Sequence, residues 1–360
     1  MKILILANSD IGLYKFRKEL ILKLLNDNEV FISLPYGEFV KRLIMMGCTF
    51  IDTNIDRRGM NPFKDIKLLK KYKRICKEIC PDYVITYTIK PNIYGALVCE
   101  KQKIDYSVNV TGLGTAFQKK GLLNAFVSFL YKKALKKAKV VFFENTENKK
   151  IFEKKKIVTG NQSFLLNGAG VNLDTFSLLA YPPMSEETRF LFIGRVMKEK
   201  GINELFQAAK KILNDGVKIH LDIVGGYEEN YKKEIENYEN EGWLTYHGFQ
   251  NDVRPFIEKC NCFVLPSWHE GMANTNLECA ASGRPVITSN VFGCKESVID
   301  GISGFLVKAK SAEDLYSAMK KFCALNYDKR TKMGIEGREH MKKNFDKNMV
   351  VDATIQAMKL

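Results

Sequence analysis

Hydrophobic and polar positions along the chain alternate between two kinds of segment. Short runs of β-branched and aromatic residues, typical of buried strands, are separated by stretches whose apolar residues recur every three or four positions, typical of amphipathic helices. The predicted strands are residues 3–7, 30–34, 49–52, 83–87, 106–110, 140–143, 190–193, 219–224, 244–247, 262–265 and 285–288. The predicted helices are residues 16–26, 62–79, 93–101, 118–139, 202–213, 230–238, 312–324 and 347–360, with another beginning near residue 273. This alternation predicts an α/β fold of parallel sheets with right-handed crossovers.

A turn-rich segment at residues 180–187, centred on Tyr181-Pro182-Pro183, divides the pattern into two halves. A chain of 360 residues is long enough for two domains, each with its own core. We expect a Rossmann-like domain at residues 1–178 and a second at 179–345, both doubly wound and facing a central cleft. Residues 346–360 are predicted to form a helix that packs back on the first domain.

Composition indicates a soluble cytoplasmic protein. The chain is 46% hydrophobic and 27% charged, and no apolar run approaches the roughly 18–20 residues that span a bilayer. The start MKILILANSD lacks the small-residue cleavage site of a signal peptide. Nine scattered cysteines show no paired zinc-site spacing, so we expect reduced thiols and no metal site.

The net charge of +15 is confined to the first half of the chain. Residues 1–175 contain 31 Lys and Arg against 16 Asp and Glu, which leaves the second half neutral. Such asymmetry indicates an anionic partner: a membrane surface, a phosphorylated substrate or a nucleic acid. No nucleic-acid-binding motif with interleaved basic and aromatic residues is present, so we expect no nucleic-acid partner.

The predicted helix at residues 118–139 differs from the others. Leu122, Leu123, Phe126 and Phe129 recur at helical spacing, and lysines flank them on both sides. This pattern suits a helix lying in the interface of an anionic membrane. It also suits an ordinary helix that covers the sheet and turns a lysine-rich face to solvent.

The segment at residues 266–283, PSWHEGMANTNLECAASG, carries the strongest chemical signal. It follows a predicted strand and places Glu270 and Glu278 eight positions apart, around a small-residue turn and a helix start. Loops at the carboxyl ends of parallel strands bind ligands in α/β sheets, and carboxylates accept hydrogen bonds from hydroxyls. The two acids therefore suit a sugar nucleotide, although the spacing alone also allows a hydrolytic acid/base pair.

Upstream, Gly194-Arg195 ends a strand and Lys200-Gly201 opens a helix. These two cations could hold a diphosphate from two sides, or they could be solvated surface charges. Gly225 lies in a turn where the backbone could approach a nucleotide. Gly248 and Phe249 follow the next strand and could present backbone groups to a nucleobase.

The first half contributes further candidates beside strand ends. Gly12 could allow close approach of a phosphate, and Arg17 lies near the start of the following helix. Lys90 and Asn92 follow one strand and Thr111 follows another. All of them are predicted to line the same cleft.

Taken in order, these motifs resemble the family 4 retaining glycosyltransferases of the GT-B fold. The matching motifs are Gly-Arg-x4-Lys-Gly at 194, His-Gly-Phe at 247, Pro-Ser-x2-Glu-Gly-x6-Glu at 266, Gly-x-Pro-Val-Ile at 283 and Gly-Phe-Leu-Val at 304. The resemblance implies that Arg195 and Lys200 form the diphosphate clamp. It implies that Glu270 lies near the donor sugar and that Glu278 hydrogen-bonds to the ribose.

The resemblance also implies roles for the residues between the two glutamates. Backbone at Gly271, Met272, Ala273, Asn274 and Thr275 would contact the donor sugar and its phosphates. The usual aromatic-glycine-leucine sequence of the family is replaced here by Met272-Ala273-Asn274, which leaves the donor sugar open.

Two first-half segments are similar to bacterial members that extend polyprenyl-diphosphate-linked sugars: residues 90–95 and 110–114. We therefore expect a retaining enzyme that moves a hexose or N-acetylhexosamine from a UDP-sugar to an undecaprenyl-diphosphate-linked saccharide of capsule, O-antigen or glycoprotein glycan. Catalysis would involve Glu270, Arg195 and Lys200 and no metal or other cofactor. Arg17, Lys90, Asn92 and Thr111 would serve the acceptor side. The protein would associate peripherally with the inner face of the plasma membrane. A soluble acceptor, or a sugar-nucleotide epimerase of the same fold, remains an alternative.

Overall fold

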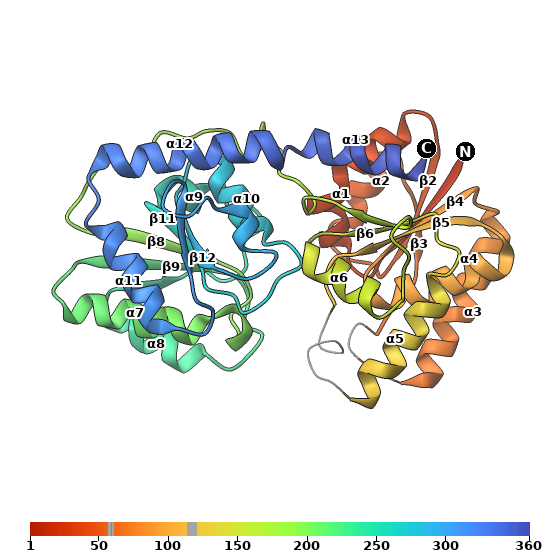
Figure 1. Cartoon of the computed structure of the whole chain (residues 1–360), viewed down its shortest axis with the longest axis horizontal. Coiled ribbons are helices and arrows are strands. Elements are labelled where there is room, and N and C mark those ends of the chain that lie inside the picture. The colour runs from red at the N-terminus through yellow and green to blue at the C-terminus, as the bar shows by residue number, and fades with distance from the viewer. Residues whose placement is uncertain (57–58, 60, 114–120) are drawn as a thin grey trace. The chain divides into compact units, whose positions relative to one another are not determined.

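The computed structural model describes residues 1–360 except 57–58, 60 and 114–120 (Figure 1). The chain divides into two compact units. Unit 1 contains Met1–Ala169 together with Asn348–Leu360, and unit 2 contains Gly170–Lys347.

Unit 1 is built on a seven-stranded sheet with the order β3-β2-β1-β4-β5-β6-β7. Every neighbouring pair in it is parallel. The strands are β1 (Lys2–Leu6), β2 (Glu29–Leu34), β3 (Thr49–Asp52), β4 (Tyr83–Tyr87), β5 (Asp105–Val110), β6 (Val140–Phe143) and β7 (Ser163–Leu165). Because β1 lies at the centre with crossovers on both sides, the sheet is doubly wound, and the loops after β1 and β4 meet at the point where the strand order reverses.

Helices cover both faces of this sheet. They are α1 (Asp10–Leu25), α2 (Val40–Met45), α3 (Pro62–Ile79), the π-helical turn η1 (Pro91–Gly95), α4 (Ala96–Gln102), α5 (Leu122–Ala134), α6 (Thr146–Lys154) and α13 (Lys347–Met358). One core cluster joins α3, α4 and α5 to the sheet, and the other joins α1 and α13. Val350, Val351 and Met358 of α13 are buried in the second cluster, so the C-terminal helix is part of unit 1.

The sequence explains the sharp boundaries of α3. The Asn61 side chain accepts hydrogen bonds from the N–H groups of Phe63 and Lys64, and Pro62 occupies the first helical turn. Cys80 ends the helix in a left-handed conformation, with its N–H bonded to the Cys76 carbonyl. The predicted span of this helix is therefore correct at both ends.

Unit 2 repeats the scheme with a six-stranded sheet, order β10-β9-β8-β11-β12-β13, again parallel throughout. The strands are β8 (Thr188–Ile193), β9 (Ile219–Val224), β10 (Leu244–Tyr246), β11 (Cys262–Leu265), β12 (Val286–Ser289) and β13 (Gly304–Val307). The helices are η3 (Lys198–Lys200), α7 (Ile202–Asn214), α8 (Lys232–Asn240), α9 (Arg254–Lys259), α10 (Asn274–Ala281), η4 (Lys295–Ser297), α11 (Ala312–Cys323) and α12 (Tyr327–Asn344). The predicted α/β class with two doubly wound sheets is confirmed.

The division between the units differs from the predicted junction at residues 178 and 179. Val171 exchanges backbone hydrogen bonds with Phe345 and Lys347, and the Arg338 guanidinium donates to the carbonyls of Leu173 and Phe176. Residues 170–178 are therefore tied to unit 2, although the marked turn signal comes later, at Pro182-Pro183.

Several element boundaries also needed correction. Helix α1 begins at Asp10, six residues before the prediction, because the Ser9 hydroxyl caps it by accepting from the Gly12 N–H. Strands β7 and β13 were not predicted, and β7 is only three residues long. Of the predicted helix at 118–139, residues 118–120 lie outside the described residues, and α5 ends at Ala134.

Candidate active site in the second unit

Glycine turns join the carboxyl ends of three strands in unit 2. The Gly194 N–H donates to the Val224 carbonyl at 2.9 Å, and the Gly225 N–H donates to the Gly248 carbonyl at 2.8 Å. Gly225 has a φ of +145°, and a Cβ added to it would lie 1.8 Å from the Gly194 carbonyl oxygen. Only glycine fits at position 225. Through these two hydrogen bonds, three predicted donor-site residues, Gly194, Gly225 and Gly248, lie together at one edge of the sheet.

A second glycine packs the loop after β8 against the loop after β11. Gly201 has a φ of +74°, and a Cβ on it would lie 2.1 Å from the Pro266 carbonyl oxygen. The Trp268 N–H also donates to the Glu199 carbonyl at 2.9 Å. These contacts hold η3, which carries Lys200, beside the loop that carries Glu270.

Lys200 and Glu270 form an ion pair across these two loops. Both side chains are largely buried, with 18% and 14% of their surfaces exposed. Beside them, burial raises the pKa of the Cys294 thiol, and the Glu270 carboxylate raises it further. The structure therefore brings together a cation from one predicted motif and a carboxylate from another, 70 residues apart.

Arg195 is held differently. Its guanidinium forms a 3.2 Å ion pair with Glu228, and its side chain is 54% exposed. Glu228 follows the Gly225-Gly226 turn and was not singled out from the sequence. Arg195 and Lys200 thus pair with different carboxylates. A diphosphate bound between the two cations would replace their ion pairs with Glu228 and Glu270.

The turn between the two glutamates is fixed by Gly293. The Ala273 N–H donates to the Gly293 carbonyl at 2.7 Å, and a Cβ on Gly293 would lie 2.6 Å from the carbonyl oxygens of Glu270 and Gly271. Met272 and Ala273 are buried, so their side chains belong to the core. Asn274 opens α10, and within the described residues its buried Oδ1 has no hydrogen-bond partner.

The remaining donor candidates lie on α10 and directly after β10. Thr275 and Glu278 are half-buried on α10, with Glu278 one turn beyond Thr275. Phe249 follows β10 directly after Gly248 and is 55% exposed.

In unit 1, Gly12 and Arg17 lie on α1. A Cβ added to Gly12 would meet only the Ser9 side chain, at an ordinary 3.6 Å, so internal packing does not require glycine there. Arg17 forms a largely buried 2.6 Å ion pair with Glu144, and its guanidinium lies 5.1 Å from the centre of the Tyr87 ring. Its charge is thus already neutralised within the fold.

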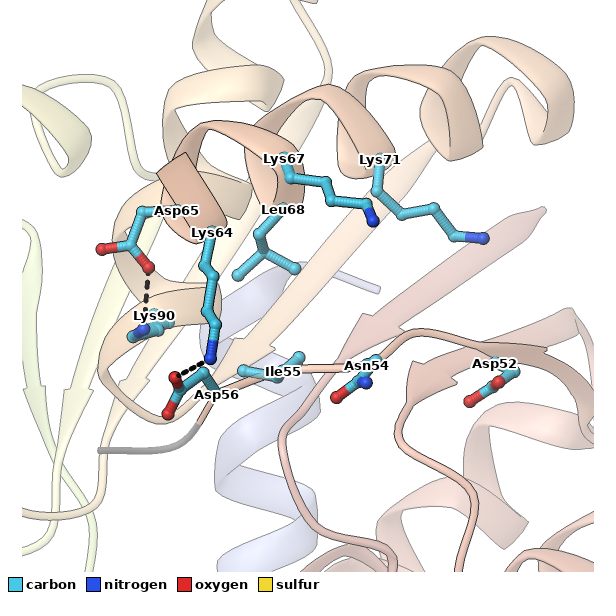
Figure 2. Close-up of a pocket in the computed structure, with 10 residues that line it drawn as sticks. All are labelled: Asp52, Asn54, Ile55, Asp56, Lys64, Asp65, Lys67, Leu68, Lys71 and Lys90. Atoms are coloured by element: carbon cyan, nitrogen blue, oxygen red, sulfur yellow. Dashed lines mark hydrogen bonds and ion pairs between the residues drawn. The ribbon is translucent and has the colours of Figure 1, made fainter. Parts of the chain in front are cut away.

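Lys90 and Asn92 follow β4, but they play different parts. The Lys90 ammonium pairs with Asp65 at 2.7 Å and lines a cavity (Figure 2). Asn92 is 1% exposed; it accepts a hydrogen bond from the Thr86 hydroxyl and donates to the Asn109 carbonyl. Asn92 therefore holds the ends of β4 and β5 together, whereas Lys90 faces a cavity that a ligand could enter.

Thr111 is half-buried and lies directly after β5. Gly114, the last residue of the motif that begins there, lies outside the described residues.

Two family profiles match the chain. Residues 181–340 match the profile described as Glycosyl transferases group 1, and residues 2–145 match Glycosyl transferase 4-like. A similar curated protein is the N,N'-diacetylbacillosaminyl-diphospho-undecaprenol alpha-1,3-N-acetylgalactosaminyltransferase of Campylobacter jejuni, 28% identical over 88% of this chain and 87% of the relative. The chain is a family-4-like glycosyltransferase.

Two further comparisons show similarity to other glycosyltransferases. The capsular polysaccharide biosynthesis glycosyltransferase CapM of Staphylococcus aureus is 28% identical over 44% of this chain and 42% of the relative. The structure of Anabaena HepE in complex with UDP and glucose is 16% identical, with a TM-score of 0.82 over 100% of this chain and 99% of that one. The expected GT-B fold is thereby confirmed.

Sequence reasoning missed two carboxylates and one backbone feature in the glycosyltransferase. Asp222 pairs with His247 at 2.7 Å and with Arg189 at 2.9 Å, beneath the glycine turns. Asp65 of α3 forms the ion pair with Lys90, and no sequence motif marked it. Thr88 adopts a φ of +72°, which is unusual for a residue other than glycine and has no signature in the sequence.

Two further observations concern membranes and metals. Across the described parts of the chain, no helix combines the length and apolarity needed to cross a bilayer. Among the same residues, no three His, Cys, Asp or Glu side chains are grouped so as to hold a metal ion.

Proposed function

We propose that this glycosyltransferase moves a hexose or N-acetylhexosamine from a UDP-sugar to a polyprenyl-diphosphate-linked saccharide, with retention of anomeric configuration. The observation that carries the proposal is the Lys200–Glu270 pair, held at a glycine-lined sheet edge beside Arg195. Two supports come from other proteins: the Campylobacter relative acts on a diphospho-undecaprenol-linked sugar, and HepE was solved with UDP and glucose.

The donor would bind with its diphosphate between Arg195 and Lys200. As the bond from the sugar C1 to the diphosphate oxygen breaks, negative charge develops on the leaving group, and two fixed cations stabilise it. The acceptor hydroxyl attacks C1 from the same face and gives its proton to a departing phosphate oxygen. Because these cations supply the neutralising charge, we propose that transfer needs no metal ion.

Glu270 and its neighbours would position the sugar. The carboxylate already faces Lys200, and a bound donor would add sugar hydroxyls that donate to it. The buried Oδ1 of Asn274 would accept another hydroxyl. Glu278 would accept from the ribose, and Phe249 would lie against the base. Gly225 and Gly248 keep the backbone close to the nucleotide without side chains in the way.

We further propose that α5 and its lysines hold the enzyme on an anionic membrane. Leu122, Phe126 and Phe129 are 92%, 59% and 54% exposed, which is a high cost for large apolar side chains in water. Lys132 and Lys133 lie in the last turn of the helix. An exposed apolar stripe with flanking cations suits a helix lying at a lipid interface.

A donor screen tests the catalytic proposal. Purified enzyme is incubated with a panel of radiolabelled UDP-sugars and membrane-extracted lipid-linked saccharides, with and without EDTA. We expect one or a few UDP-sugars to label the lipid fraction, with no loss in EDTA. Transfer only to soluble sugars, or turnover of the nucleotide sugar without any acceptor, would contradict the proposal.

Liposome flotation tests the membrane proposal. Binding to vesicles containing phosphatidylglycerol should be lost in Leu122→Glu/Phe126→Glu and retained in Ile335→Glu, which adds a charge at an exposed apolar position on α12. Equal binding by both variants would refute a role for α5.

A further inference from the structure

Unit 1 contains a cavity of about 410 Å³ between the first turns of α3 and residues 52–56 at the end of β3 and just after it (Figure 2). Its walls hold four lysines and three aspartates, together with Asn54, Ile55 and Leu68. The volume falls in the range of small-molecule sites, about 300–1,000 Å³. Asp52 ends β3 and Lys90 follows β4, so the cavity opens at the carboxyl edge of the sheet, where α/β folds bind ligands.

Two of the four lysines are neutralised by the fold. Lys64 pairs with Asp56 at 2.9 Å, and this contact, with the Gly59 N–H, lowers the pKa of Asp56 to about 2. Lys90 pairs with Asp65, which also accepts a 2.9 Å hydrogen bond from the Tyr94 hydroxyl. Each of these two lysines thus has an aspartate partner within the fold.

The other two lysines have no such partner. Lys67 and Lys71 lie one turn apart on α3, and within the described residues neither takes part in an ion pair. Like charges at this spacing destabilise a helix slightly. Figure 2 shows both extending from α3, with Asn54 and Asp52 on the other side of the cavity.

The backbone next to Lys90 is strained. Thr88 has its φ of +72°, its Oγ1 is buried, and no hydrogen-bond partner for it is found within the described residues. The chain then makes the π-helical turn η1 before α4. Strained residues and π-turns persist where a function requires them. The backbone on either side of Lys90 therefore has two features that are often found at functional sites.

We propose that this cavity binds the diphosphate of the acceptor, with Lys67 and Lys71 as its principal contacts and Lys90 at its inner end. This assignment rests on the proposed function, since it takes the acceptor to be a diphosphate-linked saccharide. One phosphate would bridge the two ammonium groups, and Asn54 and Asp52 would meet hydroxyls of the first sugar. Asp52, on the far wall, disfavours an anion there and so orients the ligand.

The first test measures binding of inorganic pyrophosphate to the full chain by calorimetry, with UDP present to occupy the donor site. Lys67→Ala/Lys71→Ala should weaken binding by about tenfold or more, because it removes both charge-assisted contacts to the phosphate. The matched control, Lys70→Ala/Lys73→Ala, removes two exposed lysines of the same helix that do not line the cavity, and should change affinity less than about twofold. No binding to the parent protein, or equal losses in both variants, would overturn the assignment.

The second test separates a lipid-linked diphosphate from a general attraction to anionic surfaces. Phosphatidylcholine vesicles carry either undecaprenyl diphosphate or phosphatidylglycerol at equal charge. The Lys67→Ala/Lys71→Ala protein should lose its preference for the diphosphate vesicles and keep its binding to phosphatidylglycerol. If it loses both equally, the lysines serve the membrane and the proposal fails. These readouts need no turnover, so failure of the donor chemistry would leave them interpretable.

Discussion

Replacing Arg195 with alanine separates catalysis from stability in this glycosyltransferase. The guanidinium lies on an exposed loop and touches Glu228 at 3.2 Å, with 54% of its side chain in solvent. Its removal therefore takes little from the fold. If it holds the donor diphosphate, the same change removes a cation from the point where negative charge develops.

The two effects differ greatly in size. An exposed ion pair contributes about 0.2–1 kcal/mol, which in a unit of this size lowers Tm by at most about 2–4 °C. One preorganised contact to a developing charge is worth about 3–4 kcal/mol, or about 10²- to 10³-fold in kcat. The variant should therefore be almost as stable as the parent and at least about a hundredfold slower.

Arg254→Ala is the matched control. Arg254 is 53% exposed, pairs with Asp252 at 2.6 Å and belongs to the same unit, but lies in none of the glycine turns. Both variants are compared with the parent by calorimetric melting and by transfer of radiolabelled sugar. A kcat for Arg195→Ala within about threefold of the Arg254→Ala value would refute the diphosphate role of Arg195.

Three further predictions concern the fold around the sites. Gly201→Ala should destabilise the protein by about 1–3 kcal/mol more than Gly216→Ala in urea unfolding. Both glycines have positive φ, but only at position 201 would the new Cβ meet a backbone atom, the Pro266 carbonyl oxygen at 2.1 Å. Equal losses would contradict the packing role. Arg17→Leu should cost about 3 kcal/mol by removing the cationic partner of the largely buried Glu144 carboxylate, and adding Glu144→Leu should restore part of that loss. If Arg17→Leu left the free energy of unfolding unchanged, the Arg17–Glu144 ion pair would be shown to be solvated. A maleimide at neutral pH should label Cys80 first, since it is exposed while burial raises the pKa of thiols such as Cys294, and Cys80→Ser should remove the fast phase seen by mass spectrometry.

Strong local signals made much of the fold predictable. The span of α3 follows from Asn61, Pro62 and the apolar spacing between them and Cys80, and the buried strands stand out as β-branched runs. Strand β7 was missed because three residues show no periodicity. The unit boundary was misplaced because bonds such as Val171 to Phe345 join residues far apart in sequence.

Candidate site residues could be proposed from the sequence only where a motif carries its own chemistry. Glycine turns and the two glutamates gave such a pattern. The ion-pair partner of each charged residue could not be predicted, because pairs such as Lys200–Glu270 and Lys90–Asp65 depend on which segments the fold brings together. Asn92 shows the converse: its position after a strand suggested a ligand contact, while its buried amide bonds to the neighbouring strands.

Transfer of label from a UDP-sugar into a lipid product tests the central claim most directly. The enzyme is incubated with radiolabelled donor and an undecaprenyl-diphosphate-linked saccharide, and the organic phase is counted and its product analysed for anomeric configuration. The account predicts acceptor-dependent label in the lipid fraction, with the anomeric configuration of the donor retained. Release of free sugar, an epimerised nucleotide sugar without acceptor, or an inverted linkage would contradict it.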